Sequence, residues 1–345
     1  MTPLVLAGPV GLTGHEGGPR HPERPARLQA VMDGIASLQL GDDLVHADER
    51  EASVEELARV HEASYLSEVQ AFCAQGGGKI DPDTYAGSDS WLTACRAAGA
   101  GLAALAELAR RDEGVAFVAA RPPGHHATAS RSMGFCLLNN VAVAAASRTA
   151  LGERVLVVDW DVHHGNGTQA IFWDDPDVLY VSSHQSPLYP GTGSPEEVGG
   201  TGAPGLTVNL PLPPGATGDV VRAAFDDEAR GAIESFSPDW VLVSCGFDAH
   251  RADPLSDLEL SSGDYAELAR LVREFAPGGR LALFLEGGYD LGALESSVAA
   301  TLGALLDIGV AVPPPTSGGP GLRELREDRA ARLRAIDRLH EQAQP

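Results

Sequence analysis

Cysteine is scarce in this chain of 345 residues, which contains only four: Cys73, Cys95, Cys136 and Cys245. No two of them have the CxxC spacing of a thiolate metal site or a redox motif. A disulfide framework, which is typical of small secreted domains, is not expected in a chain of this length. Any metal ion is therefore expected to be held by histidine and carboxylate side chains.

Positive charge and long apolar runs are also scarce. The chain has 48 acidic against 25 basic residues, and Lys79 is its only lysine. The formal net charge of -23 argues against direct binding of nucleic acid and favours cationic small molecules or basic peptides. No run approaches the roughly 20 apolar residues of a membrane span, and residues 1–12 lack the basic head of a signal peptide. We therefore expect a cytoplasmic protein without a membrane partner.

Short apolar segments alternate with helical segments along most of the chain. Hydrophobic residues make up 43% of the sequence, enough for a large core. Strands are expected at residues 114–119, 154–161, 178–184, 206–212, 240–248 and 280–288. Helices are expected at residues 91–110, 139–148, 218–235, 265–275 and 291–306. Continuously apolar strands that alternate with helices predict an α/β protein, whose parallel sheet is covered by helices on both faces.

The composition changes near the C-terminus. Residues 312–321 (VPPPTSGGPG) have the composition of a linker, which separates a main domain at residues 1–311 from a helix and tail at residues 322–345. One apolar face of this helix would consist of Leu322, Leu325, Leu333, Ile336 and Leu339. The face would pack on the chain's own domain or form a contact between copies in an oligomer.

Polar side chains follow an apolar strand in the segment Asp159–Gly167 (DWDVHHGNG). Because side chains alternate along an extended chain, Asp159, Asp161 and His163 share one face. Unpaired carboxylates near a core are costly. Three such side chains together therefore indicate a metal or catalytic site rather than packing.

A second polar segment, Cys245–His250, also follows an apolar run. Its Asp248 would join Asp161 and His163 in a three-ligand site with an open position for water and substrate, which is the arrangement of a catalytic zinc. Ligand sites in open α/β sheets lie at the carboxyl ends of the strands, where these loops should meet. His250 and Asp253 nearby are more typical of loop or supporting residues.

Two further segments carry groups suited to acid–base chemistry. His125 and His126 follow a strand in a Pro-Gly turn and could transfer protons beside a bound carbonyl, because histidine titrates near neutral pH. In the segment Glu286–Asp290 (EGGYD), two glycines would let the Tyr289 hydroxyl approach the site. A phenol placed there could donate a hydrogen bond to an oxyanion opposite the metal.

In this order and spacing, the four segments resemble the zinc-dependent histone deacetylase family, which includes acetylpolyamine amidohydrolases and acetoin-utilisation proteins. Further matches are HPERP at residues 21–25, GFCLLNN at 134–140 and YPGTG at 189–193. The similarity extends from about Gly14 to about Gly303. Asn166 and Glu286 resemble the class II branch. The resemblance implies a single open, mostly parallel eight-stranded α/β sheet, shared with arginase.

The resemblance also implies two kinds of bound ion. Asp161, His163 and Asp248 would be the ligands of one zinc ion per chain. A potassium ion would be held by Asp159, Asp161 and carbonyl groups near His163, Ser182 and Ser183.

Catalytic roles follow from the same resemblance. His126 corresponds to the general base that deprotonates the attacking water, and His125 to its electrostatic partner or acid. Asp159 would orient His125, while Asn166 would contact His126. Tyr289 would polarise the scissile carbonyl.

The residues implied to contact substrate are Gly134, Phe135, Tyr189, Leu255 and Gly287. Leu255 stands where polyamine-selective relatives can carry a glutamate. Arg24 resembles the arginine of an inner channel for acetate release. Class I enzymes grip the substrate backbone with a rim aspartate, for which Asp81 and Asp83 are the candidates here.

The implied activity is removal of acetyl or short acyl groups from the lysine side-chain amine of proteins or peptides by a deacetylase domain at residues 1–311. The alternative is an acetylpolyamine deacetylase, which the net charge favours and Leu255 disfavours. A binuclear manganese hydrolase of the arginase type would have to recruit His164 and Asp253 as further ligands. A non-catalytic reader of acetyl-lysine would have lost a ligand, a histidine or the tyrosine.

Overall fold

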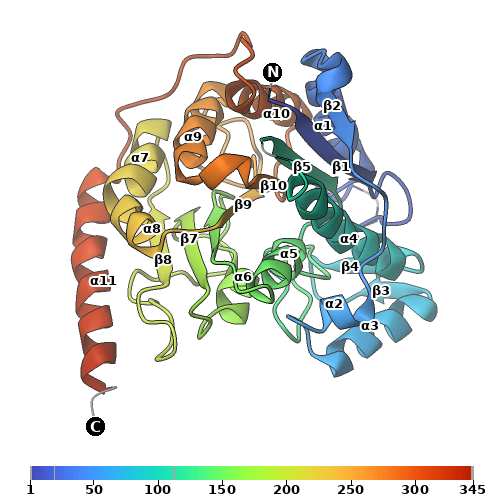
Figure 1. Ribbon diagram of the computed structural model, residues 1–345, viewed down its shortest axis with the longest axis horizontal. Helices are drawn as coiled ribbons and strands as arrows, with labels where there is room; N and C mark the ends of the chain where they lie inside the picture. Colours follow the sequence, from blue (N-terminus) through green and yellow to red (C-terminus); the bar gives the residue numbers. More distant parts are fainter. Residues whose placement is uncertain (1, 19, 112, 343–345) are drawn as a thin grey trace.

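A central eight-stranded sheet organises the computed structural model, which describes residues 2–18, 20–111 and 113–342 (Figure 1). The strand order is β2-β1-β5-β10-β9-β6-β7-β8, and all neighbouring strands are parallel. The strands are β1 (Leu4–Val10), β2 (Leu44–His46), β5 (Val115–Ala120), β6 (Val155–Asp159), β7 (Val178–Gln185), β8 (Thr207–Leu212), β9 (Trp240–Cys245) and β10 (Leu281–Leu285). The prediction of an α/β protein with an eight-stranded parallel sheet is confirmed.

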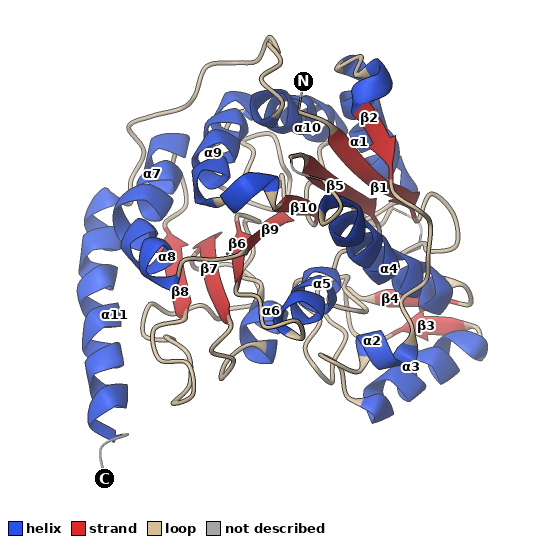
Figure 2. Ribbon diagram, in the orientation of Figure 1, coloured by secondary structure: helices blue, strands red, loops and turns tan. Residues whose placement is uncertain are grey.

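Helices cover both faces of this sheet (Figure 2). One face packs against α1 (Pro25–Ser37), α7 (Gly218–Ala223), α8 (Arg230–Phe236), α9 (Ser262–Phe275) and α10 (Leu291–Leu305). The other face packs against α2 (Val54–Leu57), α3 (Ala63–Ala74), α4 (Ser90–Leu108), α5 (Asn140–Thr149) and α6 (Asn166–Ile171). A short antiparallel hairpin, β3 (Gly77–Lys79) and β4 (Tyr85–Gly87), lies outside the sheet.

The two faces explain why the strands are continuously apolar. In β6, Val155 and Val157 belong to one buried cluster, whereas Leu156 and Val158 belong to the other. Successive side chains of a strand point to opposite faces, and both faces are covered here. Each such burial stabilises the fold by about 25 cal/mol per Å² of apolar surface.

Some elements differ from the sequence-based expectation. The helix expected at 218–235 consists of α7 and α8 joined by a π-helical segment, Ala224–Ala229. Strands β1 and β2 and helices α1 and α3 were not expected. Strand β1 contains Gly8 and Pro9, which obscure its apolar pattern, and β2 is only three residues long. Helix α1 begins with Pro25, a favoured first residue of a helix.

Helix α11 (Leu322–Gln342) packs against β8 and the π-helical segment. The five-residue apolar face expected for it is only partly correct: Leu325 is buried and Ile336 and Leu339 are half-buried, whereas Leu322 and Leu333 are exposed. Arg332 lies on the packed face as well, where its guanidinium donates a hydrogen bond to the Glu228 carbonyl. The helix therefore contacts its own chain through a narrower apolar strip with an arginine in it. Residues 343–345 of the expected tail lie outside the described part of the chain.

The segment at residues 312–321 runs along the domain surface and is tied to it by hydrogen bonds. The amide of Thr316 donates to the Asp264 carboxylate, and the amide of Gly319 donates to Thr217 Oγ1 at 2.8 Å.

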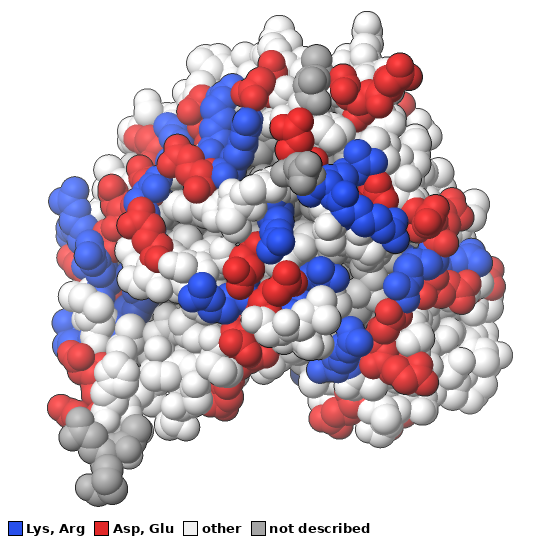
Figure 3. Space-filling view, in the orientation of Figure 1, with Lys and Arg blue, Asp and Glu red and all other residues white. Residues whose placement is uncertain are grey.

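Acidic and basic side chains are interspersed on the face shown in Figure 3. Within the described residues, no helix is long and apolar enough to cross a membrane.

Candidate active site

The loops after β5, β6, β9 and β10 meet at the carboxyl edge of the sheet. These four strands are direct neighbours, in the order β5-β10-β9-β6. Parallel neighbours end at the same edge, so residues far apart in sequence are brought together there. The four polar segments of the sequence therefore form one site.

Asp161, His163 and Asp248 form a compact group of metal-binding type. One potential ligand atom from each residue lies within 4.8 Å of the others. His163 Nδ1 is 3.1 Å from Asp161 Oδ1 and 3.2 Å from Asp248 Oδ2. Both carboxylates are buried, whereas His163 is only partly buried and lines a cavity. The group is thus open to a ligand on one side.

The electrostatics of this group favour a cation. Burial alone would lower the pKa of His163, but its hydrogen bonds to Asp161 and Asp248 outweigh burial and raise the pKa to about 10. The two carboxylates therefore stabilise positive charge at this point. Two oxygen donors, one nitrogen donor and an open side fit a divalent ion such as Zn²⁺.

Gly287 holds this group from the β10 side. Its amide donates a hydrogen bond to Asp161 Oδ2 at 2.8 Å. A Cβ atom at this position would lie 1.9 Å from Asp248 Oδ2, so only glycine fits. The structure also places Gly287 in the wall of the neighbouring cavity, where the sequence predicts a substrate contact.

His125 and His126 lie side by side, with ring centroids 4.1 Å apart. His125 Nδ1 is 3.0 Å from Asp159 Oδ2, and His126 Nδ1 is 2.8 Å from Asn166 Oδ1. Because both partners are acceptors, each Nδ1 carries the proton. The Nε2 atom of a neutral His126 is then free to accept a proton.

The two histidines have opposite electrostatic environments. Burial would lower the pKa of His125, but the charges of Asp159, Asp161 and Glu286 raise it well above its usual value. For His126, burial and the neighbouring charged His125 both lower the pKa. A charged and a neutral imidazole next to each other provide a proton donor and a proton acceptor at one pH.

Glu286 has a role here that the sequence did not reveal. Its Oε2 atom accepts hydrogen bonds from the amides of Gly124 and His125, at 2.7 and 3.1 Å. The side chain is fully buried, and burial raises the pKa of the carboxyl to about 7. The sequence identified Glu286 only as a class II feature. Its contact is with backbone amides of a distant loop, which no side-chain pattern signals.

A cavity of about 260 Å³ leads to these groups. Its wall includes all five predicted substrate-contacting residues, together with both histidines of the pair, His163, Tyr289 and Asp83. Tyr189 meets His126 edge to face, with centroids 5.1 Å apart. Gly134 lies directly behind His126, where a Cβ atom would be 2.3 Å from the imidazole Cδ2. The cavity is thus bordered by aromatic rings.

Tyr289 lies between the cavity and the protein interior. Its ring meets Phe135 edge to face at 5.9 Å, and the Arg27 guanidinium lies 4.9 Å from its centroid. The Tyr289 amide donates to Asp253 Oδ2 at 2.6 Å. Burial and the charge of Asp248 raise the pKa of Asp253 to about 7. Asp253 supports the tyrosine loop, as the sequence suggests.

The predicted role of Arg24 in an inner channel is wrong. Arg24 is the exposed residue that precedes α1. The buried arginine beside Tyr289 is Arg27, which donates hydrogen bonds to the carbonyls of Gly288 and Glu286. Arg27 also pairs with buried Glu23, which lies just before the N-cap of α1. Because Glu23 is outside the helix, no helical spacing rule marks this pair, and the sequence carried no signal that favoured Arg27 over Arg24.

The remaining candidates are the two rim aspartates and His164, a possible further metal ligand. Asp83 lines the cavity, while Asp81 Oδ1 accepts hydrogen bonds from the amides of Asp83 and Thr84. His164 faces away from the metal-binding group and contacts Thr192 and Gln169. Within the described residues, Asp161, His163 and Asp248 are therefore the only group of three side chains placed to hold a metal ion.

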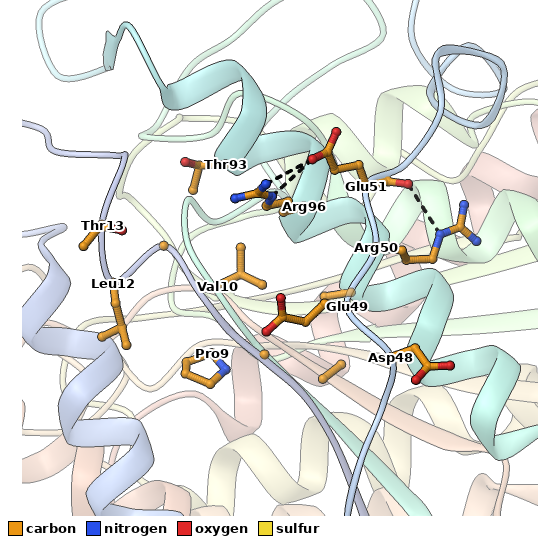
Figure 4. Close-up of a pocket in the computed structure, with 14 residues that line it drawn as sticks. Pro9, Val10, Leu12, Thr13, Asp48, Glu49, Arg50, Glu51, Thr93 and Arg96 are labelled. Carbon is orange, nitrogen blue, oxygen red and sulfur yellow. Dashed lines mark hydrogen bonds and ion pairs between the residues drawn. The ribbon is translucent and has the colours of Figure 1, made fainter.

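Another hollow, of about 340 Å³, lies between the end of β1, the loop after β2 and helix α4 (Figure 4). Its charged side chains are exposed, and an ion pair joins Arg96 Nη2 to Glu51 Oε1 at 3.2 Å. No histidine lines it. It lacks the buried, mutually perturbed groups of the cavity described above, which we identify as the candidate active site.

A buried group of two carboxylates and one histidine, beside a histidine pair at the edge of a parallel sheet, is typical of metal-assisted hydrolases. Comparison with known protein families narrows this class to one family. Residues 21–305 match the histone deacetylase domain, and the chain belongs to this family.

Two relatives and one solved structure illustrate the similarity. The chain is 39% identical over 308 residues to the chloroplastic histone deacetylase 10 of Oryza sativa, covering 83% of this chain and 70% of that protein. It is 38% identical over 293 residues to a histone deacetylase-like amidohydrolase of Pseudomonas aeruginosa, covering 83% and 76%. The crystal structure of the HDA15 HD domain matches with a TM-score of 0.86 and 34% identity over 99% of each chain. The protein is therefore a hydrolase of the deacetylase family.

Proposed function

We propose that the protein removes acetyl, or another short acyl group, from the side-chain amine of lysine in peptides or proteins. The observation that carries this proposal is one cavity lined by Phe135, Tyr189 and Leu255 together with the reactive groups His126 and Tyr289. A mostly apolar cavity suits the four-methylene chain of acetyl-lysine. Asp83 at the cavity provides an acceptor for an amide of the substrate backbone.

An acetylated polyamine is the alternative substrate, with a specific feature in its favour. Its second amine is cationic, and the chain carries a net charge of -23. Asp83 is the carboxylate among the cavity-lining residues that could pair with this amine. Leu255 lies in the same wall and offers no charge. We therefore favour the peptide substrate.

Side chains of this protein would perform the proton transfers. His126 Nε2 would take the proton from the attacking water, because its Nδ1 is committed to Asn166. Tyr289 would donate a hydrogen bond to the carbonyl oxygen as negative charge develops there. The histidine pair would return a proton to the leaving lysine amine.

Asp161, His163 and Asp248 would hold the metal, which we propose is Zn²⁺. When bound, Zn²⁺ supplies a Lewis acid for the acyl carbonyl and lowers the pKa of the attacking water. We also propose a potassium ion near Asp159 and Asp161, with a structural role.

The decisive experiment compares two substrates side by side, an acetyl-lysine peptide and N-acetylputrescine, with the zinc-reconstituted protein. The variant Asp248→Ala provides the blank. We expect a kcat/KM at least about tenfold higher for the peptide. A higher value for N-acetylputrescine would overturn the proposal in favour of polyamine deacetylation.

A further inference from the structure

His21 begins the HPERP segment at residues 21–25 and has no part in the site described so far. It lies in the loop before α1 and is half-buried. The described lining of the catalytic cavity does not include it. Its ring nevertheless contacts two residues that do line the cavity, Asp83 and Phe135. His21 is therefore placed to act on the cavity from behind.

One ring nitrogen of His21 holds the backbone of Asp83. His21 Nε2 lies 3.0 Å from the Asp83 carbonyl oxygen, and a carbonyl oxygen can only accept a hydrogen bond, so Nε2 is the donor. Nδ1 of a neutral ring accepts the Glu23 amide at 3.2 Å, whereas Nδ1 of a charged ring can donate to the Glu23 carbonyl at 3.0 Å. The hydrogen bond to Asp83 therefore forms in either charge state of His21.

Asp83 lies in the loop between β3 and β4, and part of its support comes from this loop itself. Asp81 Oδ1 accepts the Asp83 amide at 3.0 Å, and the Thr84 hydroxyl donates to Asp83 Oδ1 at 3.2 Å. The loop is tied to other segments by the Phe135 amide, which donates to Thr84 Oγ1 at 3.2 Å, and by His21, which precedes Asp83 by 62 residues. The hydrogen bond from His21 thus fixes the peptide group of Asp83 relative to the rest of the domain.

The His21 ring is itself held in place by packing. It meets the Phe135 ring edge to face, with centroids 4.7 Å apart, which is a favoured arrangement of two aromatic rings. Gly17 packs directly against the imidazole and leaves no room for a Cβ atom. The loop before α1, the loop between β3 and β4, and the wall of the cavity therefore meet at this one side chain.

We propose that His21 is a positioning residue, which fixes Asp83 for contact with the backbone of a peptide substrate. This inference rests on the proposed lysine deacetylase function, in which the Asp83 carboxylate accepts an amide of the peptide. A carboxylate that is already in place binds this amide without the cost of ordering its loop. His21 thereby favours acetyl-lysine within a peptide over the same acetylated side chain without a backbone.

The test compares an acetyl-lysine peptide with N-butylacetamide, using the zinc-reconstituted protein and measuring released acetate. N-butylacetamide has the acetylated amine and the four carbons of the lysine side chain but no backbone amide. His21→Phe keeps an aromatic ring beside Phe135 and removes the donor to Asp83. We expect the KM for the peptide to rise about fivefold with kcat unchanged, because the lost contact is the same in ground and transition states. The kcat/KM for N-butylacetamide should not change.

Further variants connect the effect to the hydrogen bond and to Asp83. His21→Gln places an amide N–H near the position of Nε2 and should keep the KM for the peptide within about twofold of wild type. His21→Leu, a second variant without the donor, should show the same rise as His21→Phe. Asp83→Ala should raise this KM by itself, and adding His21→Phe to it should cause no further rise, because both changes remove one contact. His46→Phe, at an exposed position, is the matched control and should change neither substrate.

Three results would overturn the inference while leaving the proposed function intact: an unchanged KM for the peptide in His21→Phe and His21→Leu, an equal loss on N-butylacetamide, or a further rise in KM when His21→Phe is added to Asp83→Ala. An equal loss on both substrates would mean that His21 only supports the cavity wall. Hydrolysis of N-butylacetamide or N-acetylputrescine by the wild-type protein, without hydrolysis of the peptide, would overturn both the proposed function and this inference.

Discussion

His126 Nδ1 lies 2.8 Å from Asn166 Oδ1, so a neutral amide orients the imidazole that faces the cavity. Burial and the charge of His125 already lower the pKa of His126. In Asn166→Asp a carboxylate would replace the amide and favour the charged imidazole. A histidine must be neutral to act as a general base. A histidine with a higher pKa stays protonated, and therefore inactive as a base, up to a higher pH.

We therefore expect the acid limb of the kcat/KM profile to move to higher pH in Asn166→Asp, by about one pH unit. The measurement is kcat/KM on an acetyl-lysine peptide between pH 5.5 and 9. Asn166→Ala is the control, because it removes the hydrogen bond without adding charge and should lower the rate with no upward move of the limb. An unmoved profile in Asn166→Asp would remove His126 from the role of base.

The hydroxyl of Tyr289 should be essential to turnover. Tyr289→Phe keeps the ring contacts with Phe135 and Arg27 and removes only the donor to the developing oxyanion. We expect a loss of about 10²-fold or more in kcat. Tyr265→Phe is the matched control, since the Tyr265 hydroxyl is buried without a hydrogen-bond partner and does not line the cavity. A near-normal rate for Tyr289→Phe would exclude the phenol from the mechanism.

Removal of a metal-binding carboxylate should abolish metal retention. Asp248→Ala leaves Asp161 and His163 without their third partner, and we expect both zinc content and activity to fall to background. Metal content is measured by mass spectrometry after dialysis of the reconstituted protein, with exposed Glu295→Ala as the control. One zinc ion per wild-type chain is expected. A value of two would favour the binuclear alternative.

The protein should lose stability in mild acid. His61 is buried, with Nδ1 3.0 Å from the Thr128 carbonyl and Nε2 accepting the Asn139 amide. Burial lowers the pKa of His61 to about 4 from 6.5. Between these values the unfolded chain binds a proton that the folded chain does not, so the stabilisation is complete above pH 6.5 and is lost as the pH falls toward 4.

When the pH falls from 7.5 to 5.5, the titration of His61 alone should lower the free energy of unfolding by about 1.3 kcal/mol. Urea unfolding at several pH values measures the slope. His61→Gln should reduce the slope by this amount and not abolish it, because burial also lowers the pKa of His15 and of His164 to about 4; His46→Gln, at an exposed position, should leave the slope unchanged. An equal slope in wild type and His61→Gln would contradict the assignment.

The parts of the site that could be predicted from sequence are those in which side chains follow a strand directly. Asp161 and His163 come just after β6, and Asp248 just after β9, so the parallel-sheet rule was enough to bring them to one edge. Arg27 was missed in favour of Arg24. The two lie three residues apart at the start of α1, and only the rotation of that helix decides which one is buried.

The α/β class could be predicted from the sequence alone, because apolar strands buried on both faces leave a continuous pattern that helices interrupt. The sequence also determined the chemical groups of the site and their order along the chain. Two features became visible only in the folded chain: Glu286 accepts hydrogen bonds from the amides of Gly124 and His125, and Arg27 lies against the ring of Tyr289. Both depend on contacts between segments remote in sequence, and a local pattern of hydrophobic and polar residues does not encode the distance between such segments.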